Sequence, residues 1–290
     1  MKTWQLWRAI RNPPVGHPIY RRTLRAPSEM KALNWILPSM NVFLCCATWG
    51  WVAQGSAFTA ILSILFLLFL NGTFYVIFWV SDISATIAHE QELQRYDLLR
   101  LPPAGALGSL WVLCTASLER NDLYAWVTLV RAILMTVALA VLLIIVILVI
   151  VAPTRPRLDI LMVTISTLVG LIAAAYIDYM QSVVQGCLIG MLSPTFVRQR
   201  VDARFWSVGG FLLLQAATYG SIGLFGFVLL PAIYAGLHFD GPAADISLTL
   251  FRLAGFYIIR ESLITLMLRS LTQRLNADTG EWATVMQAAS

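Results

Sequence analysis

FTAILSILFLLFLNGTFYVIFWV, residues 58–80, is an uninterrupted apolar run without a charged side chain. A membrane-spanning helix needs about 20 predominantly apolar residues, so this run is long enough to cross a bilayer. Five further runs are also predominantly apolar: 35–53, 123–152, 158–192, 205–231 and 246–268. Their apolar residues are continuous rather than alternating, which favours helices over the strands of a barrel. The sequence therefore predicts an all-α, polytopic membrane protein of about six transmembrane helices.

The composition agrees with a bilayer as solvent. Hydrophobic residues make up 59% of the 290-residue chain and charged residues only 12%, whereas a soluble domain carries about 25% charged residues. The mean hydropathy is +0.75. A chain with so few polar side chains cannot cover its own surface, which indicates a multi-pass protein of the cell (plasma) membrane, the inner membrane in a two-membrane cell.

The basic residues predict the orientation. One set of segments holds fifteen Lys and Arg residues: the stretch before the first run, the loops between runs two and three and between runs four and five, and the stretch after run six. The loops on the opposite side hold only Arg155 and Arg157. The positive-inside rule then places both termini in the cytoplasm. The formal charge of +5 needs no nucleic acid to explain it, because a basic arm beside a membrane meets anionic lipid.

The chain divides into an arm, a membrane domain and a tail. Residues 1–34 form a basic cytoplasmic arm that prolines interrupt, ending in an expected interfacial helix at 28–34, and Trp4, Trp7 and Trp35 suit the headgroup zone. Residues 35–270 form the six-helix domain, which includes a cytoplasmic segment at 82–122. Within that segment, residues 104–118 are apolar but too short to span, so we expect a helix at the interface or under the bundle. Residues 271–290 form a cytoplasmic tail.

Several catalytic motifs are absent from the sequence. It contains no G-x-x-x-x-G-K-[ST] phosphate loop, no H-E-x-x-H and no G-x-S-x-G. The three histidines lie in separate segments, and the four cysteines lack zinc or redox spacing, as expected for small core residues. We therefore expect no cofactor, no metal site and no catalysis by this chain alone.

Two of the runs contain regularly spaced glycines. Gly186 and Gly190 form G-x-x-x-G in run four, and Gly220, Gly223 and Gly226 recur every third residue in run five. Small residues let helices approach closely in lipid. Packing within the chain is favoured here over a dimer seam.

Arg131, Asp178, Arg260 and Glu261 are charged residues that fall inside the apolar runs. A charge in the bilayer costs several kcal/mol, so it usually faces the bundle and finds a partner. Counting along the runs places all four in the cytoplasmic half, where an Asp178–Arg260 pair is possible. This polar cluster could be a structural ion pair, the lining of a pathway or part of a proton relay.

The segment that follows run two is charged and amphipathic. Glu90, Glu92 and Asp97 alternate with Arg95 and Arg100 around an apolar stripe, at helical spacing. The stripe consists of Leu93, Leu98, Leu99 and Leu101. Such a helix is either a solvated extension of the span or an element that docks on a partner.

IAHEQELQRYDLLRLPP, residues 87–103, resembles the signature that follows the second span of type-two ABC exporter permeases. That family has a Glu-x-Glu pair, a short gap, an acidic residue before two leucines, and a proline. The matching residues are Glu90, Glu92, Asp97, Leu98, Leu99 and Pro102, with Leu93 on the same stripe. Gln94 and Arg95 stand where the family usually has Gly-Thr.

The resemblance implies the transmembrane permease subunit of an ABC-type exporter. This region would then couple the spans to a separate cytoplasmic ABC ATPase subunit, and the permease would form a homo- or heterodimer. The alternative is a non-transport integral-membrane scaffold subunit of a larger complex. A third interpretation, an intramembrane enzyme using Asp178, requires a second catalytic group at the same depth, which only Arg260 and Glu261 could offer.

Overall fold

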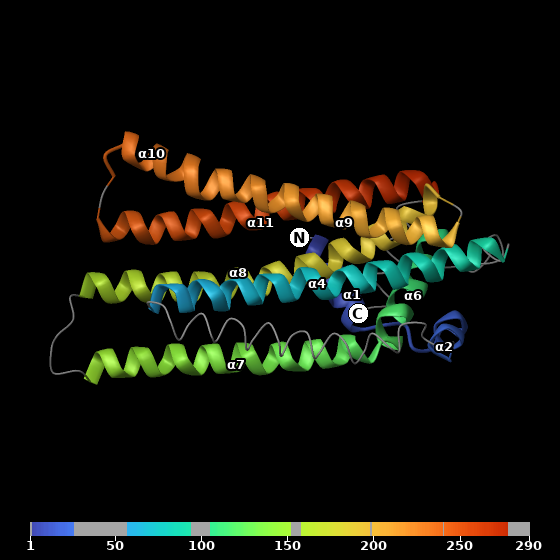
Figure 1. The fold of residues 1–290 in the computed structure, drawn as a ribbon, viewed down its shortest axis with the longest axis horizontal. Helices are drawn as coiled ribbons and strands as arrows, with labels where there is room; N and C mark the ends of the chain where they lie inside the picture. Colours follow the sequence, from blue (N-terminus) through green and yellow to red (C-terminus); the bar gives the residue numbers. More distant parts are fainter. Residues whose placement is uncertain are drawn as a thin grey trace.

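The computed structural model describes residues 2–25, 57–93, 105–151, 158–197, 199–239 and 241–277. Every regular element in these ranges is a helix, as the sequence predicts (Figure 1). The predicted first span at 35–53, the expected interfacial helix at 28–34 and residues 278–290 of the tail lie outside these residues.

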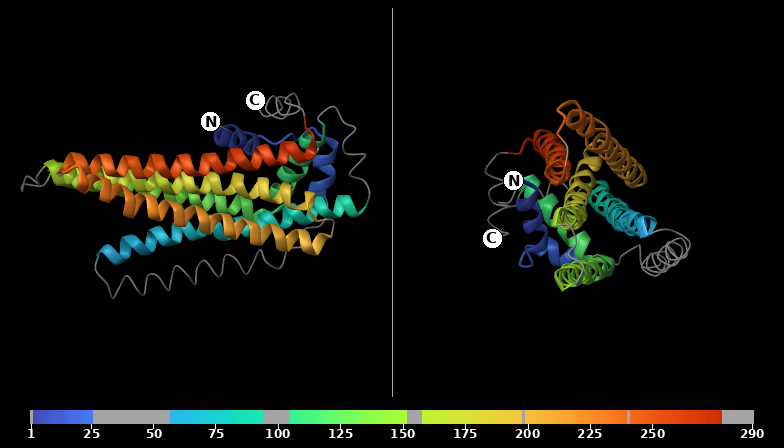
Figure 2. Two further views of the ribbon diagram at one scale, coloured as in Figure 1. Left: turned by 90° about the horizontal axis from the view of Figure 1, so that it is seen from above. Right: turned by 90° about the vertical axis from the view of Figure 1, so that its left-hand side faces the viewer.

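Five long helical segments lie side by side and alternate in direction (Figures 1 and 2). They are α4 (Ala57–Glu92), α7 (Asp122–Val151), α8 (Leu158–Leu192), α9 (Arg200–Gly223) and α11 (Pro242–Leu275). A π-helical turn, η2 (Leu224–Leu229), and α10 (Leu230–Gly236) continue α9, while the short 3-10 turn η1 (Ser193–Thr195) joins α8 to α9. Helix α8 is central, because it contacts α4, α7, α9 and α11.

Three helical segments in the described part of the chain are long and apolar enough to cross a membrane. They are Leu161–Thr195, Arg200–Gly236 and Pro242–Leu275, corresponding to predicted runs four, five and six. Run two falls within α4, and run three is helical over its described residues 123–151, within α7. Helix α4 continues without a break from its apolar run to Glu92, so the charged segment begins as an extension of the same helix.

Three short helices lie in the half of the bundle where α4 finishes (right-hand half of Figure 1). Helices α1 (Lys2–Arg11) and α2 (Pro18–Arg25) are separated by Pro13 and Pro14, confirming that prolines interrupt the arm. Helix α6 (Gly105–Arg120) is buried at every position from Leu107 to Leu118. The apolar stretch at 104–118 is therefore tucked under the bundle.

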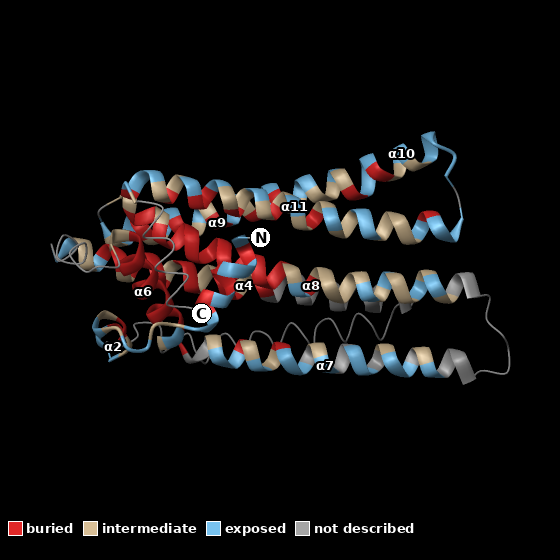
Figure 3. Ribbon diagram, turned by 180° about the vertical axis from the view of Figure 1, so that it is seen from behind, coloured by how far each residue is buried: buried red, intermediate tan, exposed pale blue. Residues whose placement is uncertain are grey.

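Buried side chains concentrate at this end, which we call the α6 end, as the colouring in Figure 3 makes plain. The opposite half of the long helices exposes large apolar side chains, including Leu143 and Ile147 of α7, Phe227 of η2, and Leu250 and Phe251 of α11. Apolar surface of this kind is matched by lipid rather than water.

Glycines in α8 permit close packing on α4. A Cβ at Gly186 would lie 2.4 Å from Val76 Cγ1, and one at Gly190 would lie 2.8 Å from Ile83 Cγ2. The G-x-x-x-G of run four therefore packs within the chain, as predicted. By contrast, a Cβ at Gly220 or Gly223 would meet no atom within 4 Å.

The two described tryptophans of the arm differ in environment. Trp4 is 45% exposed, whereas Trp7 is buried and packs edge-on against Tyr179 of α8, with ring centroids 5.6 Å apart. Trp7 therefore faces the interior of the bundle and not lipid headgroups, contrary to the prediction. Its apolar ring contributes to the inner core because α1 packs directly on α8 and α11.

Candidate functional site

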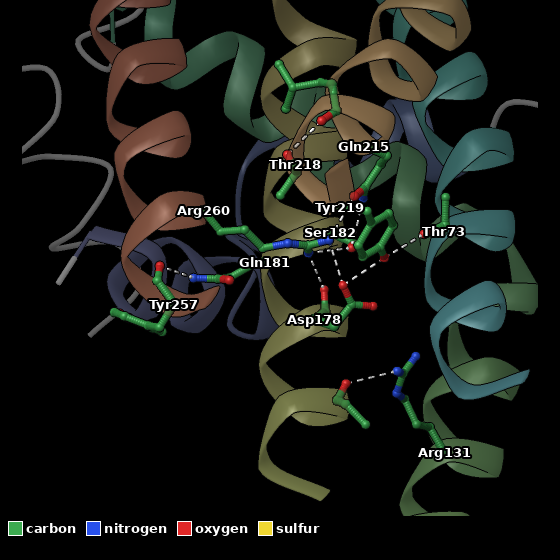
Figure 4. Close-up of polar contacts among 12 residues, drawn as sticks. Thr73, Arg131, Asp178, Gln181, Ser182, Gln215, Thr218, Tyr219, Tyr257 and Arg260 are labelled. Atoms are coloured by element: carbon green, nitrogen blue, oxygen red, sulfur yellow. Dashed lines mark hydrogen bonds and ion pairs between the residues drawn. The ribbon is translucent and has the colours of Figure 1, made fainter. Parts of the chain in front are cut away.

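A buried ion pair joins the central helix α8 to α11. Arg260 Nη2 lies 2.6 Å from Asp178 Oδ1, and both side chains are 0% exposed (Figure 4). Removing two charges from water carries a penalty of several kcal/mol per ion, which only close pairing and further hydrogen bonds offset. The pair that the sequence allowed is therefore present, and its surroundings decide what it can do.

The guanidinium of Arg260 is held by three further acceptors. Nη1 donates to the main-chain oxygen of Asp178 at 3.0 Å and to Ser182 Oγ at 2.9 Å. Nη2 donates to Gln215 Oε1 at 2.8 Å, and Gln215 Nε2 in turn donates to Ser182 Oγ at 3.0 Å. These contacts connect α8, α9 and α11 in a single layer, which orients the arginine as well as neutralising it.

Two aromatic rings flank the same guanidinium. The Cζ atom of Arg260 lies 5.1 Å from the Tyr219 ring centroid and 5.0 Å from that of Phe256, within the range of cation–π attraction. The Tyr219 hydroxyl also donates to Asp178 Oδ1 at 2.9 Å and lies 3.2 Å from Thr73 Oγ1 of α4. The layer thus reaches a fourth helix.

Arg131 approaches the pair from α7. Its Nη2 donates to the main-chain oxygen of Ala175 at 3.2 Å, and its Cζ lies 3.9 Å from the Tyr179 ring centroid. Within the described ranges, no carboxylate lies at ion-pair distance from this arginine. It is thus held by a carbonyl and a ring, with only a longer-range attraction to Asp178.

Gly72 of α4 faces the space between Arg131 and Asp178. A Cβ at this position would lie 3.2 Å from Asp178 Oδ2 and 3.7 Å from Arg131 Nη1. Asp178 Oδ2 has no hydrogen-bond partner among the residues that the structure describes. The glycine therefore allows α4 to approach a carboxylate oxygen that a larger residue would crowd.

Glu261 lies outside this cluster, although it follows Arg260 directly. Its Oε1 accepts from the backbone N of Lys2 at 2.7 Å, and its Oε2 accepts from Thr3 Oγ1 and from Tyr257 Oη, the latter at 3.3 Å. A carboxylate at the first turn of α1 complements the positive end of the helix dipole. Of the four predicted residues, Arg131, Asp178 and Arg260 are therefore brought together, while Glu261 anchors the arm.

Other polar residues of the layer had no place in the predicted cluster. Ser182 follows Asp178 by four residues on α8, and Gln215 precedes Tyr219 by four residues on α9. That spacing puts each pair on one helix face. Polar residues at i, i+4 within an apolar run could therefore have predicted that Ser182 and Gln215 join the cluster. Arg252 was also overlooked in run six: its Nε donates to the main-chain oxygen of Gly226 at 2.8 Å, in the π-helical turn.

Glu90 and Glu92, in the charged segment that follows run two, are engaged within the chain. Glu90 pairs with Arg22 of α2 at 2.5 Å, and the two side chains are 12% and 48% exposed. Glu92 Oε1 accepts from the backbone N of Arg200 at 2.9 Å, at the first turn of α9. Leu93 is 43% exposed, whereas Asp97, Leu98, Leu99 and Pro102 lie outside the described residues.

Asp82, two residues after the apolar run of α4, holds α6 in place through its carboxylate. Arg120 Nη2 donates to Asp82 Oδ2 at 2.8 Å and Ser117 Oγ donates to the same oxygen at 3.0 Å. Tyr20 of α2 donates its hydroxyl to Glu119 at the end of α6. Burial and this carboxylate raise the pKa of Tyr20, so the hydroxyl remains a donor at physiological pH.

The described residues contain no group of three or more His, Cys, Asp or Glu side chains that could hold a metal ion. Asp178 makes its contacts with Arg260 and Tyr219 rather than with a second carboxylate. This arrangement favours a structural ion pair over general acid–base chemistry. Comparison with protein-family models, with curated proteins and with solved structures finds no match to this chain.

Proposed function

We propose that this chain is the membrane permease subunit of an ABC-type exporter, driven by a separate cytoplasmic ATPase. The observation that carries the proposal is the continuity of α4, which runs from its apolar segment into the Glu-x-Glu segment of the resemblance without a break. A partner that pushes on the charged end of this helix would move the span itself.

The connections of α4 support this role. Asp82 and Arg120 join α4 to α6, which is buried at the α6 end. Glu92 joins the end of α4 to the first turn of α9, and Glu90 joins it to the arm. Displacement of the segment would therefore reach α6, α9 and α2 together.

The two glutamates act mainly as positioning residues in this proposal. Glu90 is largely covered by its contact with Arg22, and a carboxylate at the first turn of α9 is stabilised by the helix dipole. In this proposal the ATPase contacts the exposed Leu93 and the leucine pair that follows it in the sequence at 98–99. An apolar contact with a polar rim is typical of the core of a protein interface.

The full proposal includes features beyond the three apolar helices noted above. It requires six spans, with residues 35–53 forming the first, both termini in the cytoplasm, a plasma-membrane location and dimerisation with another permease subunit. ATP binding and hydrolysis would belong to the partner subunit. The basic asymmetry of the loops and the arrangement of α1, α2 and α6 at one end are consistent with that orientation.

The test is co-purification with a candidate ABC ATPase, preferably one encoded beside this chain, followed by measurement of ATP hydrolysis. Leu93→Asp and the double variant Leu98→Asp/Leu99→Asp should lose the ATPase while retaining the elution profile of the wild type. Val15→Asp is the matched control, because Val15 is 59% exposed in the turn between α1 and α2. Equal retention by all variants would exclude this segment as the docking site.

A scaffold subunit is the second candidate, and the internal engagement of Glu90 and Glu92 favours it. If both acids serve only to hold α2 and α9, the segment needs no ATPase partner. Such a protein would retain no ABC ATPase from its own membrane and would stimulate no ATP hydrolysis, while co-purifying with other membrane subunits.

A further inference from the structure

Helix α1 presents one covered face and one basic face. Thr3, Leu6, Trp7, Ala9 and Ile10 are buried, packed where α1 contacts α8 and α11. Trp4, Arg8 and Arg11 are exposed. Their i, i+4, i+7 spacing places these three side chains on one stripe of the helix, which we call the Trp4 stripe.

The described part of the protein does not neutralise the charges of the Trp4 stripe. No Asp or Glu occurs between Lys2 and Arg25 in the sequence. Among the residues that the structure describes, neither Arg8 nor Arg11 lies within ion-pair distance of a carboxylate. The stripe is therefore an exposed cationic surface that complements an anion.

The depth of the stripe follows from α7. Trp7 of α1 packs on Tyr179, whose hydroxyl lies 3.3 Å from Thr128 Oγ1 of α7, and the exposed Trp126 stands two residues before Thr128. Exposed apolar side chains continue along α7 from Trp126 to Ile147, a rise of about 31 Å at 1.5 Å per residue. This matches the hydrocarbon thickness of about 30 Å, so Trp126 marks the inner boundary and the stripe lies at headgroup level.

The stripe is also fixed in position. The carboxylate of Glu261 receives the backbone N–H of Lys2 and the hydroxyl of Thr3, and Trp7 packs on Tyr179. A helix anchored at its first turn and along its buried face keeps its exposed side chains in register with α7. Arginine beside tryptophan on a fixed interfacial helix suits the phosphate of an anionic lipid.

We propose that Trp4, Arg8 and Arg11 form a binding site for the headgroup of an anionic phospholipid in the inner leaflet. The phosphate contacts the two guanidinium groups, and the indole lies among the upper acyl-chain and glycerol carbons. The site is independent of any ATPase partner, because it requires only that α1 lie beside the membrane boundary.

The test is thermal unfolding of the purified protein in detergent micelles titrated with phosphatidylglycerol, phosphatidylcholine or inorganic phosphate. Phosphatidylglycerol should raise the Tm of the wild type, and the other two additives should not. Since each basic residue near an anionic surface contributes about 1 kcal/mol, Arg8→Gln/Arg11→Gln should weaken the apparent affinity about thirty-fold. Arg8→Lys/Arg11→Lys should retain most of the stabilisation.

The matched control is Arg155→Gln/Arg157→Gln, which removes two positive charges from the sequence between α7 and α8. It should respond to phosphatidylglycerol like the wild type. Equal weakening in the control, or no weakening in Arg8→Gln/Arg11→Gln, would overturn the assignment. An equal response to phosphatidylcholine would also overturn it, and an equal response to inorganic phosphate would identify a site for soluble anions instead.

If Arg8→Gln/Arg11→Gln does not fold, the wild type alone decides. Stabilisation by phosphatidylglycerol must then fall as salt is raised, because exposed charges are screened within about 10 Å at 0.1 M ionic strength. A response that is insensitive to salt would exclude the guanidinium–phosphate contact.

Discussion

Breaking the Asp178–Arg260 pair should have a large and unequal effect depending on which partner is removed. Removing one member of a buried pair typically destabilises a protein by about 3–5 kcal/mol. In Asp178→Leu the guanidinium keeps Ser182, Gln215 and a main-chain oxygen as acceptors, but it retains its charge because arginine does not lose its proton in proteins. In Arg260→Leu the stranded carboxylate can take up a proton and become neutral. We therefore expect Asp178→Leu to be at least as damaging as Arg260→Leu.

The double variant Asp178→Leu/Arg260→Leu separates pairing from packing. It removes both charges and leaves apolar side chains in a buried layer. Its loss in free energy of unfolding should therefore be smaller, by about 2 kcal/mol or more, than the sum of the losses in the two single variants, which is the upper part of the range for interacting residues. The assay is the free energy of unfolding in mixed micelles with increasing SDS, supported by the folded yield in size-exclusion chromatography. If the two single losses add up to the loss in the double variant within about 0.5 kcal/mol, the argument is refuted, because the effects of mutations at non-interacting residues are additive to about that precision.

Three further predictions concern orientation, packing and the arm. Reporter fusions at residue 290 and at Gly236 should report opposite sides of the membrane, and a cytoplasmic Gly236 would reverse the orientation. Gly72→Val should lower the free energy of unfolding by about 1–3 kcal/mol through overpacking, since even a Cβ would lie 3.2 Å from Asp178 Oδ2; Gly72→Ala should be milder, and equal effects would contradict crowding as the cause. Arg22→Glu and Glu90→Arg should each loosen the arm against protease, and the double exchange should restore protection; no rescue would mean that their contact does not hold α2.

The sequence predicted the helical elements well because hydropathy and proline act locally. The described residues of runs two to six all fall within helices, and the arm breaks at Pro13 and Pro14. The stretch at 104–118 was expected as a helix because it is apolar yet too short to span, and it is buried as α6. These features depend on the hydrophobicity of residues that are close together along the chain, which can be read from a single sequence.

The contacts of charged residues were harder to predict because they join distant parts of the chain. Glu90 and Arg22 are 68 positions apart, and Glu261 and Thr3 are 258 apart. Amphipathic spacing identified the segment around Glu90 but could not reveal that α2 would cover it. Likewise, sequence adjacency grouped Glu261 with Arg260, although neighbouring residues on a helix point about 100° apart.

These internal contacts change how the acidic signature should be interpreted. If Glu90 and Glu92 met an ATPase directly, charge reversal would affect the partner and leave the bundle intact. Because Glu90 instead holds Arg22 and Glu92 receives the first backbone N–H of α9, reversal would also release α2 and weaken the start of a spanning helix. Loss of transport in such a variant could therefore arise from a misplaced α9 even if the partner still bound. Leu93 is the better probe of docking, since it is exposed and its replacement leaves both glutamate contacts in place.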